Sequence, residues 1–259
     1  MYGPRDSGAS PVWYSDKTTL LTDRSDILER WAEHFNTVLN QRSNFDDSVL
    51  DGIPQWKTAD ELQDPPSLIE ATNAIRQMST GKAPGEDSIP AEIYKCGGLQ
   101  LAQQLQLLYT KIWAEESVPQ EFRDALVIHL YKRKGDRACC DDHRGISLLS
   151  VAGKILARLL TNRLSAHVDA NDIIPESQFG FRSGRGTTDM IFTARQIQEK
   201  CKEQHKDLYA VFIDLTKAFD SVSRDGLWKI LGKIGCPAKF INIIRSFHCG
   251  MMARVQEAG

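Results

Sequence analysis

The chain has 259 residues, of which 41% are hydrophobic and 25% are charged, and its formal net charge is −2. This composition is typical of a soluble globular chain, and the sequence has no apolar run of membrane-spanning length and no signal-peptide core near its start. The six cysteines are scattered, which excludes a small disulfide-stapled scaffold. We therefore expect an intracellular protein that does not contact a membrane.

Charge is distributed unevenly along the chain. Residues 1–64 carry 12 acidic and 6 basic side chains, whereas residues 123–206 carry 15 basic and 10 acidic ones. A basic half permits a polyanionic partner such as a nucleic acid. A solvated surface of mixed charge explains an imbalance of this size almost as well.

The N-terminal part predicts two helices separated by a linker. In residues 25–39, apolar side chains recur at three- and four-residue spacings, as on one face of a helix. Residues 40–66 are acidic and end in Asp-Pro-Pro, which is typical of a linker. Ser67 then opens the second helix, with Glu70 at the capping-box position.

A loop and a long helix follow. Residues 81–90, GKAPGEDSIP, contain two glycines and two prolines, so this loop is rigid and can approach a ligand closely. A helix stop followed by a turn is the alternative interpretation. The leucine stripe of residues 99–116 predicts an amphipathic helix that faces a hydrophobic core.

Residues 125–131 and 144–149 predict a β-hairpin with a basic tip. Such a tip can bind phosphates, although a charged loop kept soluble by its charges is about as common. Its cationic side chains are Lys132, Arg133, Lys134 and Arg137. Residues 139–143 include every type of zinc ligand, but adjacent cysteines point apart and no second ligand pair follows, so we do not expect zinc.

Aromatic, glycine and arginine residues are concentrated between two further predicted helices, at 151–168 and 188–204. The intervening residues 178–188, QFGFRSGRGTT, hold two aromatics, three glycines and two arginines. Aromatics beside arginines suit stacking and phosphate contacts with a nucleic acid, and a glycine-rich turn ahead of a helix is a general anion site.

The apolar run at 208–213 ends at Asp214 and predicts a strand buried on both faces. A carboxylate at the end of such a strand caps the next helix or binds a metal ion rigidly, and periodicity alone slightly favours the cap. Helices over 223–234 and 238–249, separated by a break at Gly235, are predicted to form a helical hairpin.

The order of these motifs resembles the reverse transcriptase of non-LTR retrotransposons and, more distantly, that of group II introns. GKAPGEDSIP is similar to the family's N-terminal extension motif. YKRKGD, HRGISLL and KILARLLTNRL resemble its finger motifs, and QFGFRSGRGTTD is similar to the motif that follows them. FIDLTKAFDSV resembles the first palm motif, and the likeness covers about residues 67–250.

The resemblance implies a helix-rich α/β chain of the α+β type with a right-hand polymerase architecture. The expected parts are a helical linker at 1–66, fingers at 67–205 and the start of a palm at 206–259. The implied activity is DNA synthesis on an RNA template by a two-metal mechanism. Its implied partners are Mg2+, deoxynucleotide triphosphates, an RNA template and a DNA primer.

Individual residues match the family's motifs. Asp214 matches the catalytic metal ligand, with the carbonyl of Leu215 nearby, and Phe219 matches the aromatic under the incoming sugar. The implied nucleotide-binding residues are Lys132, Lys134, Arg144 and Phe219. The implied template-binding residues are Lys82, Gln178, Gly180, Phe181 and Arg182. Gly145 stands where the family usually has proline, which we expect to loosen this finger strand.

The carboxylates that should accompany Asp214 are missing from the sequence. Two metal ions about 3.5–4 Å apart need more than one carboxylate, and the family supplies two more from a downstream YxDD-type hairpin. No adjacent Asp pair follows residue 220, and the pairs at 46–47 and 141–142 lie upstream in predicted loops. We therefore expect a chain truncated after the first palm motif and inactive by itself.

Two other interpretations remain open. The chain could be a non-catalytic retroelement remnant that binds RNA or single-stranded nucleic acid. It could also be an unrelated α/β metal-dependent hydrolase, which the ordered motifs disfavour. In either case an incomplete palm sheet is expected to leave an open edge and apolar surface that promote aggregation.

Overall fold

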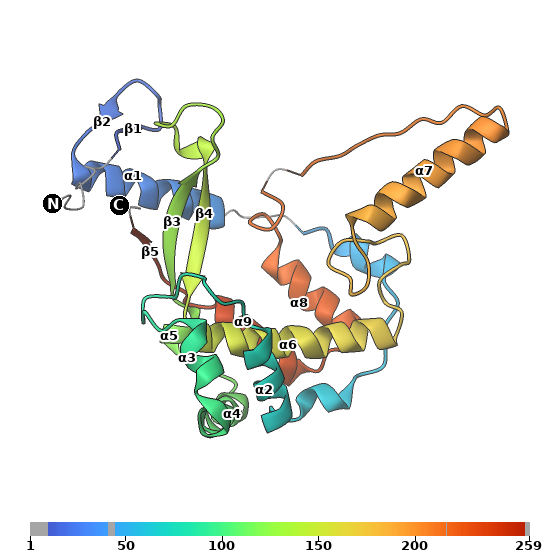
Figure 1. Cartoon of the computed structure of the whole chain (residues 1–259), viewed down its shortest axis with the longest axis horizontal. Helices are drawn as coiled ribbons and strands as arrows, with labels where there is room; N and C mark the ends of the chain where they lie inside the picture. The colour runs from blue at the N-terminus through green and yellow to red at the C-terminus, as the bar shows by residue number, and fades with distance from the viewer. Residues whose placement is uncertain (1–9, 41–44, 216, 257–259) are drawn as a thin grey trace. The chain divides into compact units, whose positions relative to one another are not determined.

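The computed structural model describes residues 10–40, 45–215 and 217–256. It is a helix-rich α/β chain with two small sheets (Figure 1). The chain divides into two compact units, one formed by residues 1–163 and 219–259 and the other by residues 164–218. Among the described helices, none combines the length and the apolar character that a membrane span requires.

The strands and helices have the following bounds. The strands are β1 (Val12–Trp13), β2 (Leu20–Leu21), β3 (Ala125–Tyr131), β4 (His143–Leu149) and β5 (Ala253–Gln256). The helices are α1 (Arg24–Leu39), α2 (Leu68–Gln77), α3 (Ala91–Cys96), α4 (Gly98–Glu115), α5 (Gln120–Arg123), α6 (Val151–Ala170), α7 (Thr187–Glu203), α8 (Arg224–Lys233) and α9 (Ala238–His248). Between α1 and α2 the chain forms two 3-10 helices, Asp47–Gly52 and Asp60–Gln63.

The predicted hairpin is confirmed and forms the larger sheet. Strands β3 and β4 pair antiparallel over seven residues, from Ala125 opposite Leu149 to Tyr131 opposite His143. Strand β5 adds to the other edge of β3 in parallel, with Ala253 opposite Ala125. The sheet order is therefore β4-β3-β5 (Figure 1), and β3 is paired on both edges.

A stack of aromatic rings joins α1 to the hairpin. The indole of Trp31 is buried and lies parallel to the His129 ring, with 4.1 Å between ring centroids. His143 meets the same indole edge-on, and its Nε2 donates to the carbonyl oxygen of Arg137 at 2.8 Å. Since a carbonyl oxygen only accepts, this hydrogen bond places a proton on His143 Nε2. Through its contacts with Arg137 and with Trp31, His143 connects the base of the basic tip to α1.

Gly145 also belongs to this junction. It pairs with His129 in the regular β3–β4 ladder, so the expected loosening of the strand is wrong. A Cβ atom at this position would lie 2.6 Å from a ring carbon of Phe35 on α1. The absence of a side chain therefore lets the helix pack directly on the strand.

The helices α2, α4, α6 and α9 supply most of the remaining core of the first unit. Tyr109 and Trp113 of α4 are buried, and the Tyr109 hydroxyl donates to the carbonyl of Ala152 at 2.8 Å. Trp113 lies edge-on to Phe240 of α9. The predicted apolar stripe of α4 is core in part, because Leu105, Ile112 and Trp113 are buried whereas Leu108 is 38% exposed.

The second unit contains α7 and the extended residues after it. Helix α7, all of whose residues the structure describes, has no buried residue. The strand predicted at 208–213 is wrong, because these residues carry no strand assignment and pair with neither sheet. An apolar run becomes a buried strand only when neighbouring strands complete its ladder, and the described residues supply none for it.

We expect Gly145→Ala to destabilise the first unit by about 1–3 kcal/mol, because the new methyl group must displace Phe35. Gly52→Ala is the matched control, since nothing lies within 4 Å of a Cβ there. Urea unfolding should separate the two variants. Equal unfolding midpoints would contradict the packing described at Gly145.

His129 should make stability depend on pH. Burial, followed by the charges of His143 and Arg137, lowers the pKa of His129 from 6.5 to about 4. As the pH falls, the unfolded chain protonates His129 at a higher pH than the folded chain does. The contribution of His129 to the free energy of unfolding is therefore complete above pH 6.5 and is lost as the pH falls towards 4.

Between pH 7 and pH 5 we expect a loss on the order of 1 kcal/mol, after allowance for the partial solvent contact of the ring. His129→Phe should flatten this part of the profile, and His205→Phe, at an exposed turn, should leave it unchanged. Urea midpoints at each pH measure the effect. An unchanged slope in His129→Phe would exclude this histidine as the cause.

Candidate nucleic-acid interface

The GKAPG loop packs closely against the start of α6. Gly85 is buried, and a Cβ atom there would lie 2.5 Å from the backbone nitrogen of Ser150. Ser150 in turn caps α6, because its hydroxyl accepts from the Gly153 N–H at 3.1 Å. A glycine is required at this contact because its partner is backbone, which has little room to move.

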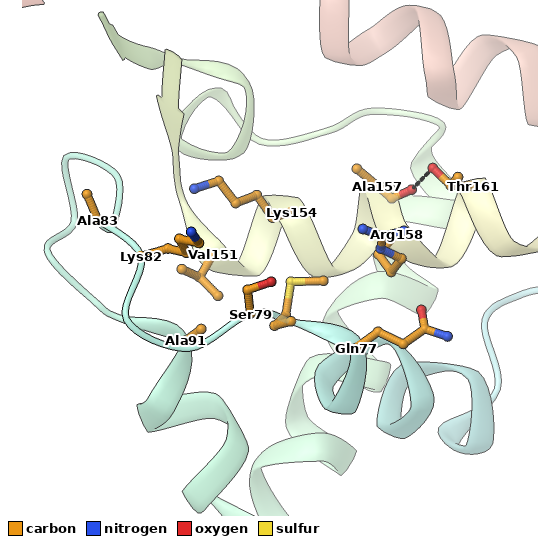
Figure 2. Close-up of a pocket in the computed structure, with 11 residues that line it drawn as sticks. Gln77, Ser79, Lys82, Ala83, Ala91, Val151, Lys154, Ala157, Arg158 and Thr161 are labelled. Carbon is orange, nitrogen blue, oxygen red and sulfur yellow. Dashed lines mark hydrogen bonds between the residues drawn. The ribbon is translucent and has the colours of Figure 1, made fainter. Parts of the chain in front are cut away.

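This packing creates a pocket of about 470 Å3 between the loop and α6 (Figure 2). Three cationic side chains line it, and no carboxylate does. Lys82 comes from the loop, whereas Lys154 and Arg158 lie one turn apart on α6. The other lining residues are Gln77, Met78, Ser79, Ala83, Ala91, Val151, Ala157 and Thr161.

The electrostatics of the pocket favour an anion. Burial lowers the pKa of Lys154, and the opposing effect of the Asp87 carboxylate only partly compensates. A partly desolvated ammonium group gains from an anionic partner, since its interactions with water have already been reduced. With Lys82 and Arg158 beside it, the pocket concentrates positive charge of the kind that phosphates seek.

An ion pair holds the pocket walls together. Arg163 of α6 donates to both carboxylate oxygens of Glu70 on α2, at 2.5 and 2.9 Å. Burial would raise the pKa of Glu70, but the hydrogen bonds from Arg163 and Ser67 outweigh it and hold the value at about 2. Ser67 and Glu70 also form the predicted capping box, so one carboxylate both starts α2 and fixes it to α6.

The hairpin tip presents a second group of cations. Lys132 is exposed, but its Nζ donates to the carbonyl of Asp141 at 2.6 Å and so helps to fold the tip. Arg133 and Lys134 are exposed at the turn, and Arg144 is exposed on β4. At the tip, Lys132 therefore makes a structural hydrogen bond, whereas Arg133 and Lys134 are directed to solvent.

The loop before α7 holds four of the predicted template contacts in the second unit. Gln178 donates to the carbonyl of Gly180 at 3.2 Å within the loop. Arg182 pairs with Glu176 at 3.2 Å, and the Arg182 side chain is 13% exposed. Phe181 has a φ of 59°, and 94% of its surface is accessible to solvent.

Asp214 and Leu215 are both exposed in the extended segment after α7, and Phe219, in the first unit, is exposed as well. No group of three or more His, Cys, Asp or Glu side chains that could hold a metal ion occurs among the described residues. A two-ion site needs several converging carboxylates. The residues around Asp214 do not fit such a site as they are placed.

The structure thus brings together some of the predicted residues. Lys82 lies with Lys154 and Arg158, two residues that the sequence analysis did not single out as binding residues. Their spacing of four residues on one helix places them on the same side, which is the signal that could have found them. The residues at the hairpin tip form a separate group.

Comparisons with known proteins agree with this arrangement of motifs. Residues 132–258 match the family described as reverse transcriptase (RNA-dependent DNA polymerase). The chain is 29% identical over 178 residues to a probable RNA-directed DNA polymerase from transposon BS of Drosophila melanogaster. The aligned residues cover 69% of this chain and 20% of that protein.

Other relatives have similar names. The chain is 29% identical to the RNA-directed DNA polymerase from mobile element jockey of Drosophila melanogaster, over 70% of this chain and 20% of that protein. It is 25% identical to an uncharacterized 149 kDa protein of transposon TX1 from Xenopus laevis, over 91% of this chain and 18% of the relative. The chain thus spans about a fifth of the length of these relatives.

These matches define a reverse-transcriptase domain. The domain is of the non-LTR retrotransposon type, as the sequence motifs predicted. Members of this family generally use a divalent metal ion with nucleic-acid and nucleotide substrates.

Proposed function

We propose that this chain contributes the template-binding fingers and the start of the palm of a right-hand polymerase that copies RNA into DNA. Residues 67–205 correspond to the fingers and residues 206–259 to the palm in this proposal, with residues 1–66 as a preceding linker. Its basis is the order of the motifs together with the basic pocket.

The pocket carries the proposal. Lys82, Lys154 and Arg158 line one concave surface without a carboxylate. Arginine and lysine side chains supply most of the contacts that position a nucleic-acid backbone. We assign these three residues to the phosphates of the RNA template.

The other predicted residues take roles in the same scheme. Lys132, Lys134 and Arg144 at the hairpin approach the nucleotide triphosphate or the template. Residues 178–182 lie along the templating strand, where Phe181 stacks on a base. Asp214 and the Leu215 carbonyl contribute to Mg2+ binding when further carboxylates are supplied, and Phe219 packs under the incoming sugar.

A second candidate function is RNA binding without catalysis. It is favoured by the exposed position of Asp214, to which the described residues add no metal-binding group. In this case the chain binds single-stranded nucleic acid through the pocket and the hairpin tip alone. Primer extension with an added C-terminal segment separates the two functions, and an RNA-binding experiment tests the pocket that both of them use.

The first experiment is primer extension on an RNA template with Mg2+. We expect no DNA synthesis by the 259-residue chain, because a single carboxylate cannot hold both metal ions. If activity appears when a longer C-terminal segment is supplied, Asp214→Ala should abolish it and Asp207→Ala, in the same exposed segment, should not. Robust extension by the 259 residues alone would refute the expected inactivity.

The second experiment measures binding of single-stranded RNA at several salt concentrations. Lys154→Gln with Arg158→Gln should weaken binding about tenfold at low salt and reduce the salt slope by about 1.4, because two phosphate contacts are lost. Lys57→Gln with Lys111→Gln removes the same charge from exposed positions elsewhere and is the control. Equal loss in both double variants would show that net charge, and not the pocket, binds the RNA.

A further inference from the structure

Ser79 is a polar residue of the basic pocket to which the proposed function gives no role. It follows α2, which ends at Gln77, and it is exposed in a segment that is neither helix nor strand. In Figure 2 its side chain lies between Lys82 of the loop and Arg158 of α6, and all three residues line the pocket. The Ser79 hydroxyl group is therefore accessible and lies in a region of positive charge.

The residues before Ser79 match the preference of one class of enzyme. Residues 76–79 are Arg-Gln-Met-Ser, with an exposed arginine three positions before the hydroxyl group. Basophilic serine/threonine protein kinases select substrates by charge pattern, and arginine at this spacing is a common requirement. The spacing alone does not single out Ser79, because it recurs before Ser147, Thr161 and Thr188.

The structure separates Ser79 from these three residues. A protein kinase binds its acceptor in an extended backbone, so an acceptor within a helix or a strand ladder must first be released from it. Ser147 is paired in the β3–β4 ladder, Thr161 lies in the middle of α6, and Thr188 lies in the capped first turn of α7. At Ser79 only the last turn of α2 has to open, and helix ends fray at little cost.

The cations of the pocket suit a phosphate on Ser79. Phosphorylation adds a charge of about −1.5 to −2 near pH 7, together with three acceptor oxygens. Lys82, Lys154 and Arg158 supply three positive charges, and no carboxylate among the lining residues repels the phosphate. Burial has already reduced the hydration of Lys154, so its ammonium group gains from an anion beside it.

We propose that Ser79 is a phosphorylation site for a basophilic serine/threonine kinase, and that its phosphate occupies the basic pocket in place of a phosphate of the RNA template. The Ser79 hydroxyl oxygen forms a bond to the γ-phosphorus of ATP, the bond from that phosphorus to the bridging oxygen breaks, and ADP leaves. The hydroxyl proton passes to a carboxylate of the kinase. The effect on RNA rests on the proposed function, whereas the modification and the position of the phosphate do not.

The first test maps the modification. The whole chain is incubated with MgATP and a calmodulin-activated protein kinase that selects arginine at this spacing, and tandem mass spectrometry locates the phosphate. We expect Ser79 to be modified at least about tenfold faster than Thr161, which shares both the pocket and the spacing but lies within α6. Arg76→Gln should slow the reaction, and Arg195→Gln, at an exposed arginine of α7, should not.

Three results of this mapping would overturn the proposal. They are an unmodified Ser79, faster modification of another hydroxyl group in the chain, and equal rates in Arg76→Gln and Arg195→Gln.

The second test locates the phosphate by phosphorus-31 NMR of the phosphorylated chain. The second pKa of phosphoserine is about 6, and nearby cations favour the dianion, so we expect a lower pKa in the chain than in free phosphoserine. Lys154→Gln with Arg158→Gln should raise this pKa, and Lys57→Gln with Lys111→Gln, at exposed positions elsewhere, should not. A pKa equal to that of free phosphoserine would show that the phosphate lies outside the pocket.

The third test compares binding of single-stranded RNA by the phosphorylated and unmodified chains at low salt. We expect phosphorylation to weaken binding at least about tenfold, and Ser79→Ala to remove the effect of kinase treatment. An unchanged RNA affinity would overturn the regulatory role. If Lys154→Gln with Arg158→Gln shows that the unmodified pocket does not bind RNA, the proposed function fails together with this role, whereas the first two tests still decide the modification and the position of the phosphate.

Discussion

The central position of β3 is the constraint on which the first unit depends. Its two edges pair with β4 and with β5, and one face carries the His129 ring against Trp31 of α1. The seven residues of β3 thus contact three other segments of the chain, namely α1, β4 and β5. The hairpin tip, the N-terminal helix and the segment after α9 cannot move independently, because each needs β3 for its hydrogen bonds or its packing.

The basic pocket lies directly after strand β4 of this sheet, at the start of α6. Strand β4 ends at Leu149, Ser150 caps the next helix, and Gly85 packs on that junction. Lys154 and Arg158 are therefore placed by the strand that precedes them, and Lys82 by the glycine that lets its loop approach. The pocket is a property of the junction between sheet and helix, and its charges are held by rigid elements.

Local signals predicted much of this structure. The capping box at Ser67 and Glu70, the hairpin with its charged turn and the amphipathic helices all depend on residues close in sequence, and the structure confirms each. The features that the sequence did not predict depend on distant partners. Strand β5 has weak strand character by itself and exists because β3 offers an edge, whereas residues 208–213 have strong strand character and no partner strand in the described chain. The pocket likewise joins residues about 70 positions apart, which no local pattern reveals.

The parallel pairing of β5 also has a consequence for the order in which the protein is made. Met252, just before β5, donates its N–H to Asp124, just before β3, across 128 residues of sequence. During synthesis the hairpin and α1 can associate early, whereas the second edge of β3 stays open until β5 has been translated and released from the ribosome. Closing so long a loop is slow compared with forming a hairpin, so we expect the β3–β5 pairing to form after the β3–β4 hairpin. Until the β3–β5 pairing forms, the second edge of β3 is open to pairing with other chains.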